Sequence, residues 1–93
     1  MTPKTNVAEY LETAIRLSGK TQREIAKAAG YTKPNVISMM KKGQTKIPIE
    51  KIPALAAAAS IEAAPFLRLA LQEYMPETWH VIYANLENFK ENA

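Results

Sequence analysis

The sequence predicts an all-α fold, in which five short helices form one domain and an extra amphipathic helix follows at the C-terminus. No stretch alternates apolar and polar residues with the period of two that a half-buried strand requires, and the β-branched residues are scattered. Apolar residues instead recur at helical spacing, in segments that glycines and prolines separate. With 93 residues and no internal repeat, the chain has the length of a single small domain.

The first helix is predicted to begin at Asn6, because Glu9 stands three residues later as a capping-box partner. Gly19 ends it, since a residue without Cβ adopts the left-handed conformation that follows many helices. Its apolar stripe consists of Val7, Leu11, Ala14 and Ile15.

The second helix is predicted to begin at Thr21, where Thr21 and Glu24 form another capping box, and to stop at Gly30. The third begins near Pro34 and runs to about Lys42. Projection at 100° per residue separates two faces of this third helix. The apolar face holds Val36, Ile37 and Met40, and the polar face holds Asn35, Ser38 and Lys42, with Met39 at the border.

Prolines indicate where the remaining helices begin. Pro53 is compatible with the first turn of a helix over about 51–59, and Pro65 with that of a helix over about 63–74. The core candidates of this fifth helix are Phe66, Leu69, Ala70 and Leu71. Pro76 then precedes a sixth helix over about 77–90. Its predicted apolar face consists of Trp79, Ile82, Tyr83, Leu86 and Phe89.

Residues 21–43 have the parts of a helix-turn-helix, two short helices joined by a tight turn. Ala26 is small where the helices cross, Gly30 permits the turn, and Ile25 and Tyr31 anchor its two sides. An apolar back and a polar, cationic front suit the third helix to the major groove of double-stranded DNA. The predicted DNA-contacting residues are Thr21, Gln22, Arg23, Lys33, Asn35, Ser38, Met39, Lys41, Lys42 and Lys46.

Charge is unevenly distributed along the chain. Residues 1–51 hold ten of the twelve Lys and Arg against four Glu, a net charge of +6, and residues 52–93 carry a net charge of −3. This asymmetry is typical of a polyanion-binding head and a solvated or self-associating tail, although it also arises from chance surface decoration.

The sequence divides into a DNA-binding domain over residues 1–75 and a C-terminal helix over residues 76–93. The large apolar side chains of that helix have two interpretations: they fold back over the same domain, or they pair with a second copy. We favour the second, and predict a homodimer. An alternative is an antitoxin-like regulator, in which the same helix binds a partner protein.

Composition excludes several functional classes. The absence of cysteine and the single histidine, His80, argue against disulfides, a metal site or a cofactor, and are consistent with a reducing cytoplasm. The sequence offers no phosphate-binding glycine loop and no nucleophile–base set, so we predict that the protein is not an enzyme. No apolar run approaches the length of a membrane span.

The segment resembles the Cro/cI-like (XRE) helix-turn-helix family of phage and prophage repressors. The matching residues are Thr21-Gln22, Glu24, Ile25-Ala26, Gly30, Ile37-Ser38, Met40, Gly43 and Leu55-Ala56. The resemblance covers about residues 6–73 and implies a five-helix lambda-repressor-like domain that represses transcription as a homodimer on a near-palindromic operator. In that family the positions matching Gln22, Asn35 and the polar face of the third helix usually contact DNA.

The sequence departs from the family pattern in one place. The spacing from Gly30 to Gly43 is one residue longer than usual, and Lys33-Pro34 stands where a capping serine often lies. If the extra residue lies in the turn, Ile37 and Met40 are the core pair of the third helix. If it lies later, Val36 and Met39 take that role and the set of base-contacting residues shifts by one.

Overall fold

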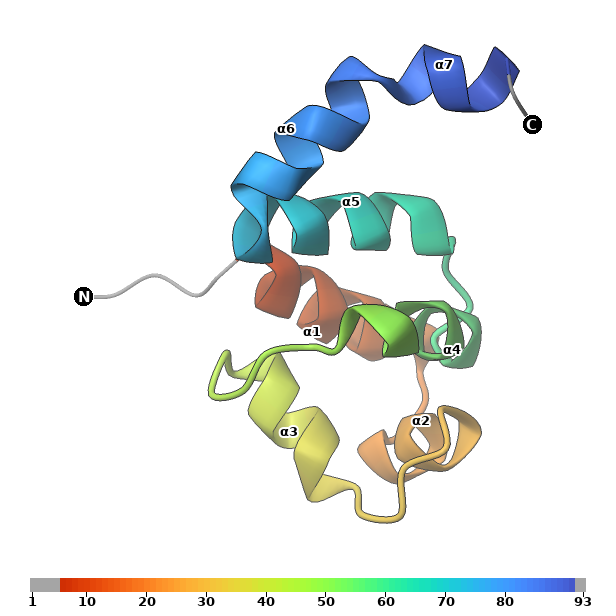
Figure 1. The fold of residues 1–93 in the computed structure, drawn as a ribbon. Coiled ribbons are helices and arrows are strands. Elements are labelled where there is room, and N and C mark those ends of the chain that lie inside the picture. The colour runs from red at the N-terminus through yellow and green to blue at the C-terminus, as the bar shows by residue number, and fades with distance from the viewer. Residues whose placement is uncertain (1–5, 92–93) are drawn as a thin grey trace.

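A computed structural model describes residues 6–91, and in this range all regular secondary structure is helical, as predicted. Within residues 6–91, seven α-helices and one short 3₁₀ helix follow one another (Figure 1). Their bounds are α1 Asn6–Ser18, α2 Gln22–Ala28, α3 Asn35–Lys41, η1 Ile49–Lys51, α4 Ile52–Ala58, α5 Ala63–Tyr74, α6 Pro76–Ala84 and α7 Leu86–Glu91.

The first five α-helices enclose one hydrophobic core. α1 packs against α3 and α5, while α4 packs against α2 and α5. The Phe66 ring of α5 is fully buried and lies 5.5 Å from the Tyr10 ring of α1. All described buried side chains are apolar, and the largest fully buried ones are Phe66, Leu11, Ile25, Ile37, Met40, Ile47, Ile52, Leu55 and Val7. Apolar burial therefore holds these short helices together.

The predicted bounds of these five helices agree with the structure to within one or two residues. α1 begins at Asn6 and is followed by Gly19, whose φ of 73° is the left-handed conformation expected there. The proposed cap by the Asn6 side chain lies outside the described side chains. In α5, Phe66 and Ala70 are buried as predicted, whereas Leu69 and Leu71 are only half-buried.

The prediction of one continuous C-terminal helix is wrong, because the chain breaks at Asn85 into α6 and α7. The side-chain Nδ2 of Asn85 donates to the Val81 carbonyl at 2.8 Å. The backbone N–H of Asn85 donates instead to the Ile82 carbonyl at 3.1 Å. The Asn85 side chain thus takes the hydrogen bond to the Val81 carbonyl that the Asn85 backbone N–H makes in a continuous helix, and the helix ends there.

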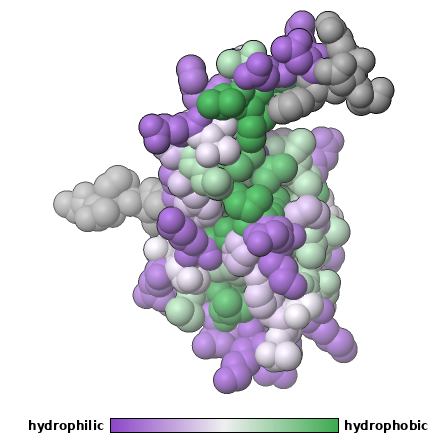
Figure 2. Space-filling view, viewed as in Figure 1, coloured by the Kyte–Doolittle hydropathy of each residue, from purple (hydrophilic) through white to green (hydrophobic). Residues whose placement is uncertain are grey.

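The C-terminal helices extend from the body. α6 packs against α5, and Figure 1 shows α7 continuing away from the five-helix domain. Hydrophobic residues gather where α6 adjoins the body, while the end of the molecule with α2 and α3 is largely hydrophilic (Figure 2). α6 therefore partly covers α5, with Trp79 and Ile82 half-buried, whereas Tyr83 and Leu86 are exposed.

No helix within residues 6–91 has the length and apolar character needed to span a membrane. In the same range no group of three or more His, Asp or Glu side chains is placed to hold a metal ion.

Candidate nucleic-acid interface

The N-terminus of α2 is fixed by the predicted capping box. The Glu24 backbone N–H donates to Thr21 Oγ1 at 3.1 Å, and the Thr21 backbone N–H donates to Glu24 Oε1 at 2.8 Å. The hydrogen bond from the Thr21 backbone, followed by that from its side chain, lowers the pKa of the Glu24 carboxyl. The carboxylate is therefore favoured in its charged form. The cap thus fixes where α2 starts, and with it the neighbouring Gln22 and Arg23.

The turn between α2 and α3 depends on Gly30. Its φ of 86° lies in the left-handed region that side chains with a Cβ rarely adopt. The Tyr31 backbone N–H then donates to the Ala26 carbonyl at 2.8 Å and closes the end of α2. Ile25 and Ala26 are buried and Tyr31 is half-buried, so both sides of the turn are anchored as predicted.

The structure distinguishes the two registers of α3. Ile37 and Met40 are fully buried, Val36 is half-buried, and Met39 is 39% exposed. Ile37 and Met40 are therefore the core pair of α3, as in the first of the two alternatives. Asn35 and Lys42 are exposed, and Ser38 is half-buried. The polar side of α3 consequently faces outward while its apolar side packs against α1 and α2.

The other predicted DNA contacts lie outside the core but differ in exposure. Thr21, Arg23, Lys33 and Lys46 are exposed, and Gln22 and Lys41 are half-buried. None of the ten predicted side chains belongs to the buried core.

Two lysines of the basic half stabilise helix ends. Lys20 Nζ donates to the Ala58 carbonyl at 2.8 Å, at the last residue of α4. Lys51 Nζ donates to the Ala29 carbonyl at 3.5 Å, just after α2, and lies 5.1 Å from the centre of the Tyr31 ring. A cation at a helix C-terminus interacts favourably with the helix dipole and the free carbonyls. Lys20 and Lys51 of the basic N-terminal half therefore stabilise the fold.

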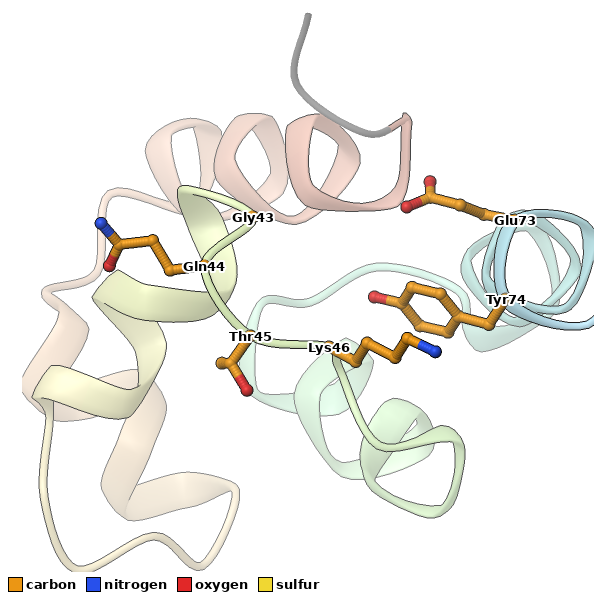
Figure 3. A pocket seen from close by; sticks show the side chains of 6 residues that line it. All are labelled: Gly43, Gln44, Thr45, Lys46, Glu73 and Tyr74. Atoms are coloured by element: carbon orange, nitrogen blue, oxygen red, sulfur yellow. The ribbon is translucent and has the colours of Figure 1, made fainter. Parts of the chain in front are cut away.

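The loop after α3 is held by the end of α5. The Ile47 backbone N–H donates to the Tyr74 hydroxyl at 3.0 Å, and Lys46 Nζ lies 5.4 Å from the centre of the Tyr74 ring. Figure 3 shows the Lys46 side chain extending along Tyr74, at a pocket of about 340 Å³ that the loop shares with α5. Sequence reasoning missed Tyr74, because its contacts join residues 27 positions apart and leave no local pattern.

The predicted dimerisation residues lie on both C-terminal helices. Trp79 and Ile82 are half-buried, with the Trp79 and Tyr83 rings 5.8 Å apart. Tyr83 is 66% exposed, Leu86 is exposed, and Phe89 lies outside the described side chains. Val81, which the prediction did not include, is 61% exposed. The break at Asn85 divides the expected single face between α6 and α7.

The arrangement of α2, turn and α3 is also what a comparison with protein families detects. A family model described as Helix-turn-helix matches residues 11–64, more than half of the chain. The matched range runs from α1 into the first turn of α5 and includes both helices of the motif. Neither the curated proteins nor the solved structures gave a significant match.

Proposed function

This chain belongs to the Cro/cI-like (XRE) helix-turn-helix family of DNA-binding regulators, and from that premise we propose that it represses transcription by binding a near-palindromic operator as a homodimer. The observation that supports it most is the two-sided character of α3. Ile37 and Met40 are buried against the domain, and the side with Asn35 and Lys42 is free. A helix held rigidly from behind enters a major groove without reorganising.

The polar residues divide by the chemistry of their contacts. Asn35 suits an adenine edge, Ser38 donates or accepts, and Met39 suits a thymine methyl group. Thr21, Gln22 and Arg23 at the start of α2 contact phosphates, as do Lys33, Lys41, Lys42 and Lys46. These phosphate contacts set the register on the duplex without reading its sequence.

The proposal predicts specific and strongly salt-dependent binding. A duplex selected from a random pool is labelled and competed with unrelated duplex at physiological salt. Log affinity should fall steeply with log salt, because each neutralised phosphate releases counterion. Lys42→Ala should weaken binding to all duplexes and reduce the magnitude of the salt slope by about one. Equal competition by selected and unrelated duplexes contradicts the proposal.

A second copy is the partner that we propose for α6 and α7. Val81, Tyr83 and Leu86 expose apolar surface on a segment that extends from the body, and pairing of two such segments removes it from water (Figure 1). In this dimer the two α3 helices enter successive major grooves about 34 Å apart.

Sedimentation equilibrium of the full chain tests this arrangement. We expect a dimer that becomes a monomer when residues 76–93 are removed, and also when Val81 and Tyr83 are both changed to Glu in the full-length chain. The control is Leu17→Glu, because Leu17 on α1 is 75% exposed but lies outside the proposed interface. A wild-type monomer, soluble only with a co-expressed partner protein, favours the antitoxin-like alternative instead.

A further inference from the structure

The last two residues of α5 hold two other segments in place. Glu73 Oε1 accepts a hydrogen bond of 3.0 Å from the Val7 backbone N–H in the first turn of α1. The Tyr74 hydroxyl accepts one of the same length from Ile47, in the loop that follows α3. Because α5 buries Phe66 and Ala70 in the core, its end is a fixed point for both segments.

Tyr74 contacts the loop in two ways. Its hydroxyl accepts the hydrogen bond from the Ile47 backbone N–H, and the Ile47 side chain is itself buried. Its ring lies beside the ammonium of Lys46, at a distance typical of a cation–π interaction. Burial is the largest influence on the Tyr74 hydroxyl and raises its pKa. Backbone and side chain of two successive loop residues therefore depend on one tyrosine (Figure 3).

Apart from the buried side chain of Ile47, the loop is held by few backbone hydrogen bonds. α3 ends at Lys41, and the N–H groups of Gly43 and Gln44 turn back to the carbonyls of Met40 and Met39. The next hydrogen bond along this backbone is the one from Ile47 to Tyr74. The Lys46 side chain is exposed and departs from the loop just before this attachment.

We propose that Tyr74 is a positioning residue for DNA binding, which fixes the loop after α3 so that Lys46, against the end of α5, is held in place to meet a phosphate. The inference rests on the proposed function. A loop that is ordered before binding loses less conformational entropy when the complex forms. Tyr74 therefore raises affinity without touching DNA, and its effect passes through Lys46.

Tyr74→Phe tests the hydrogen bond while keeping the ring. We expect this variant to bind the selected duplex about 3–10-fold more weakly than wild type, in line with the loss of one partly buried hydrogen bond. Amide exchange of Ile47 should accelerate at least about tenfold, while that of the core residue Leu55 changes little. Tyr10→Phe is the matched control, because Tyr10 is also half-buried against α5 but lies on α1, away from the loop.

A double-mutant cycle separates positioning from general stability. Tyr74→Leu should weaken binding less in a Lys46→Ala background than in wild type, because the side chain that Tyr74 positions is then absent. A tyrosine that acted only through global stability would cost the same factor in both backgrounds, which would overturn the inference.

The outcomes distinguish the inference from the function on which it rests. If wild type prefers no duplex, the proposed function fails and the inference falls with it. If wild type prefers the selected duplex and Tyr74→Phe binds it equally well, the inference alone fails. Unchanged exchange at Ile47 in Tyr74→Phe overturns it by a measurement that needs no DNA.

Discussion

Replacing Ile37 with alanine is expected to lower the free energy of unfolding by about 2–5 kcal/mol, the range measured for truncation of large aliphatic side chains in cores. Ile37 is fully buried in the shared core of the domain. A domain of this size has a total stability of only about 5–15 kcal/mol, so the loss is a large fraction of it. Urea unfolding followed by circular dichroism measures the change.

Ile37→Ala should weaken DNA binding by more than the loss of folded molecules alone explains. α3 has seven residues, too few for a helix to be stable alone, and Ile37 and Met40 hold it against α1 and α2. A cavity behind the helix loosens its position even in folded molecules. We therefore expect weaker binding to the selected duplex at temperatures where the variant is fully folded.

Two variants bracket this prediction. Ile37→Val removes one methylene and should cost about 0.5–1.5 kcal/mol. Met39→Ala lies on the same helix, but Met39 is 39% exposed, so it should change the free energy of unfolding much less. A loss below about 1 kcal/mol in Ile37→Ala, equal to that in Met39→Ala, would mean that α3 does not depend on this contact.

Sequence predicted the first five helices well because their ends are determined locally. The capping box of Thr21 and Glu24 involves residues three apart, and Gly19 ends α1 through its own φ. The same local spacing left two candidates for the core pair of α3: Ile37 with Met40, or Val36 with Met39. Choosing between Ile37 and Val36 required the packing of α1 and α2 behind the helix, which no spacing within residues 30–43 contains.

The C-terminal break was missed because apolar periodicity continues through it. Trp79, Ile82 and Leu86 keep helical spacing, and Asn85 occurs in continuous helices as well as at their ends. The hydrogen bond from its side chain to the Val81 carbonyl decides whether the helix continues. The side chain and the backbone N–H of Asn85 compete for that carbonyl.

Long-range contacts of charged and polar groups were equally inaccessible to sequence reasoning. Lys20 and the Ala58 carbonyl are 38 residues apart, and Lys51 and the Ala29 carbonyl are 22 apart. From the sequence alone, these lysines contribute to a basic half in the same way as Lys42. The structure shows that Lys20 and Lys51 stabilise helix ends, whereas Lys42 is exposed at the end of α3.

Replacing Asn35 with alanine is expected to weaken binding to the selected duplex by about 1–3 kcal/mol and to relax the preference at one base-pair position. Asn35 is the first residue of α3 and is exposed, with Ser38 and Lys42 following at helical spacing on the same side. The substitution removes the Asn35 side-chain amide, which is expected to donate one hydrogen bond to an adenine edge and accept another, and alanine replaces neither. Titrations against the selected duplex and its single-base variants measure both effects.

Specificity and affinity should respond differently in the control variants. This difference tests whether α3 is the helix that reads the base sequence. Lys42→Ala should lower affinity for every duplex alike, since a phosphate contact is independent of sequence. Gln72→Ala should do neither, because Gln72 is an exposed amide on α5. If Asn35→Ala instead behaves like Lys42→Ala, with an unchanged order of preference among the duplexes, Asn35 does not read a base and another residue of α3 must do so.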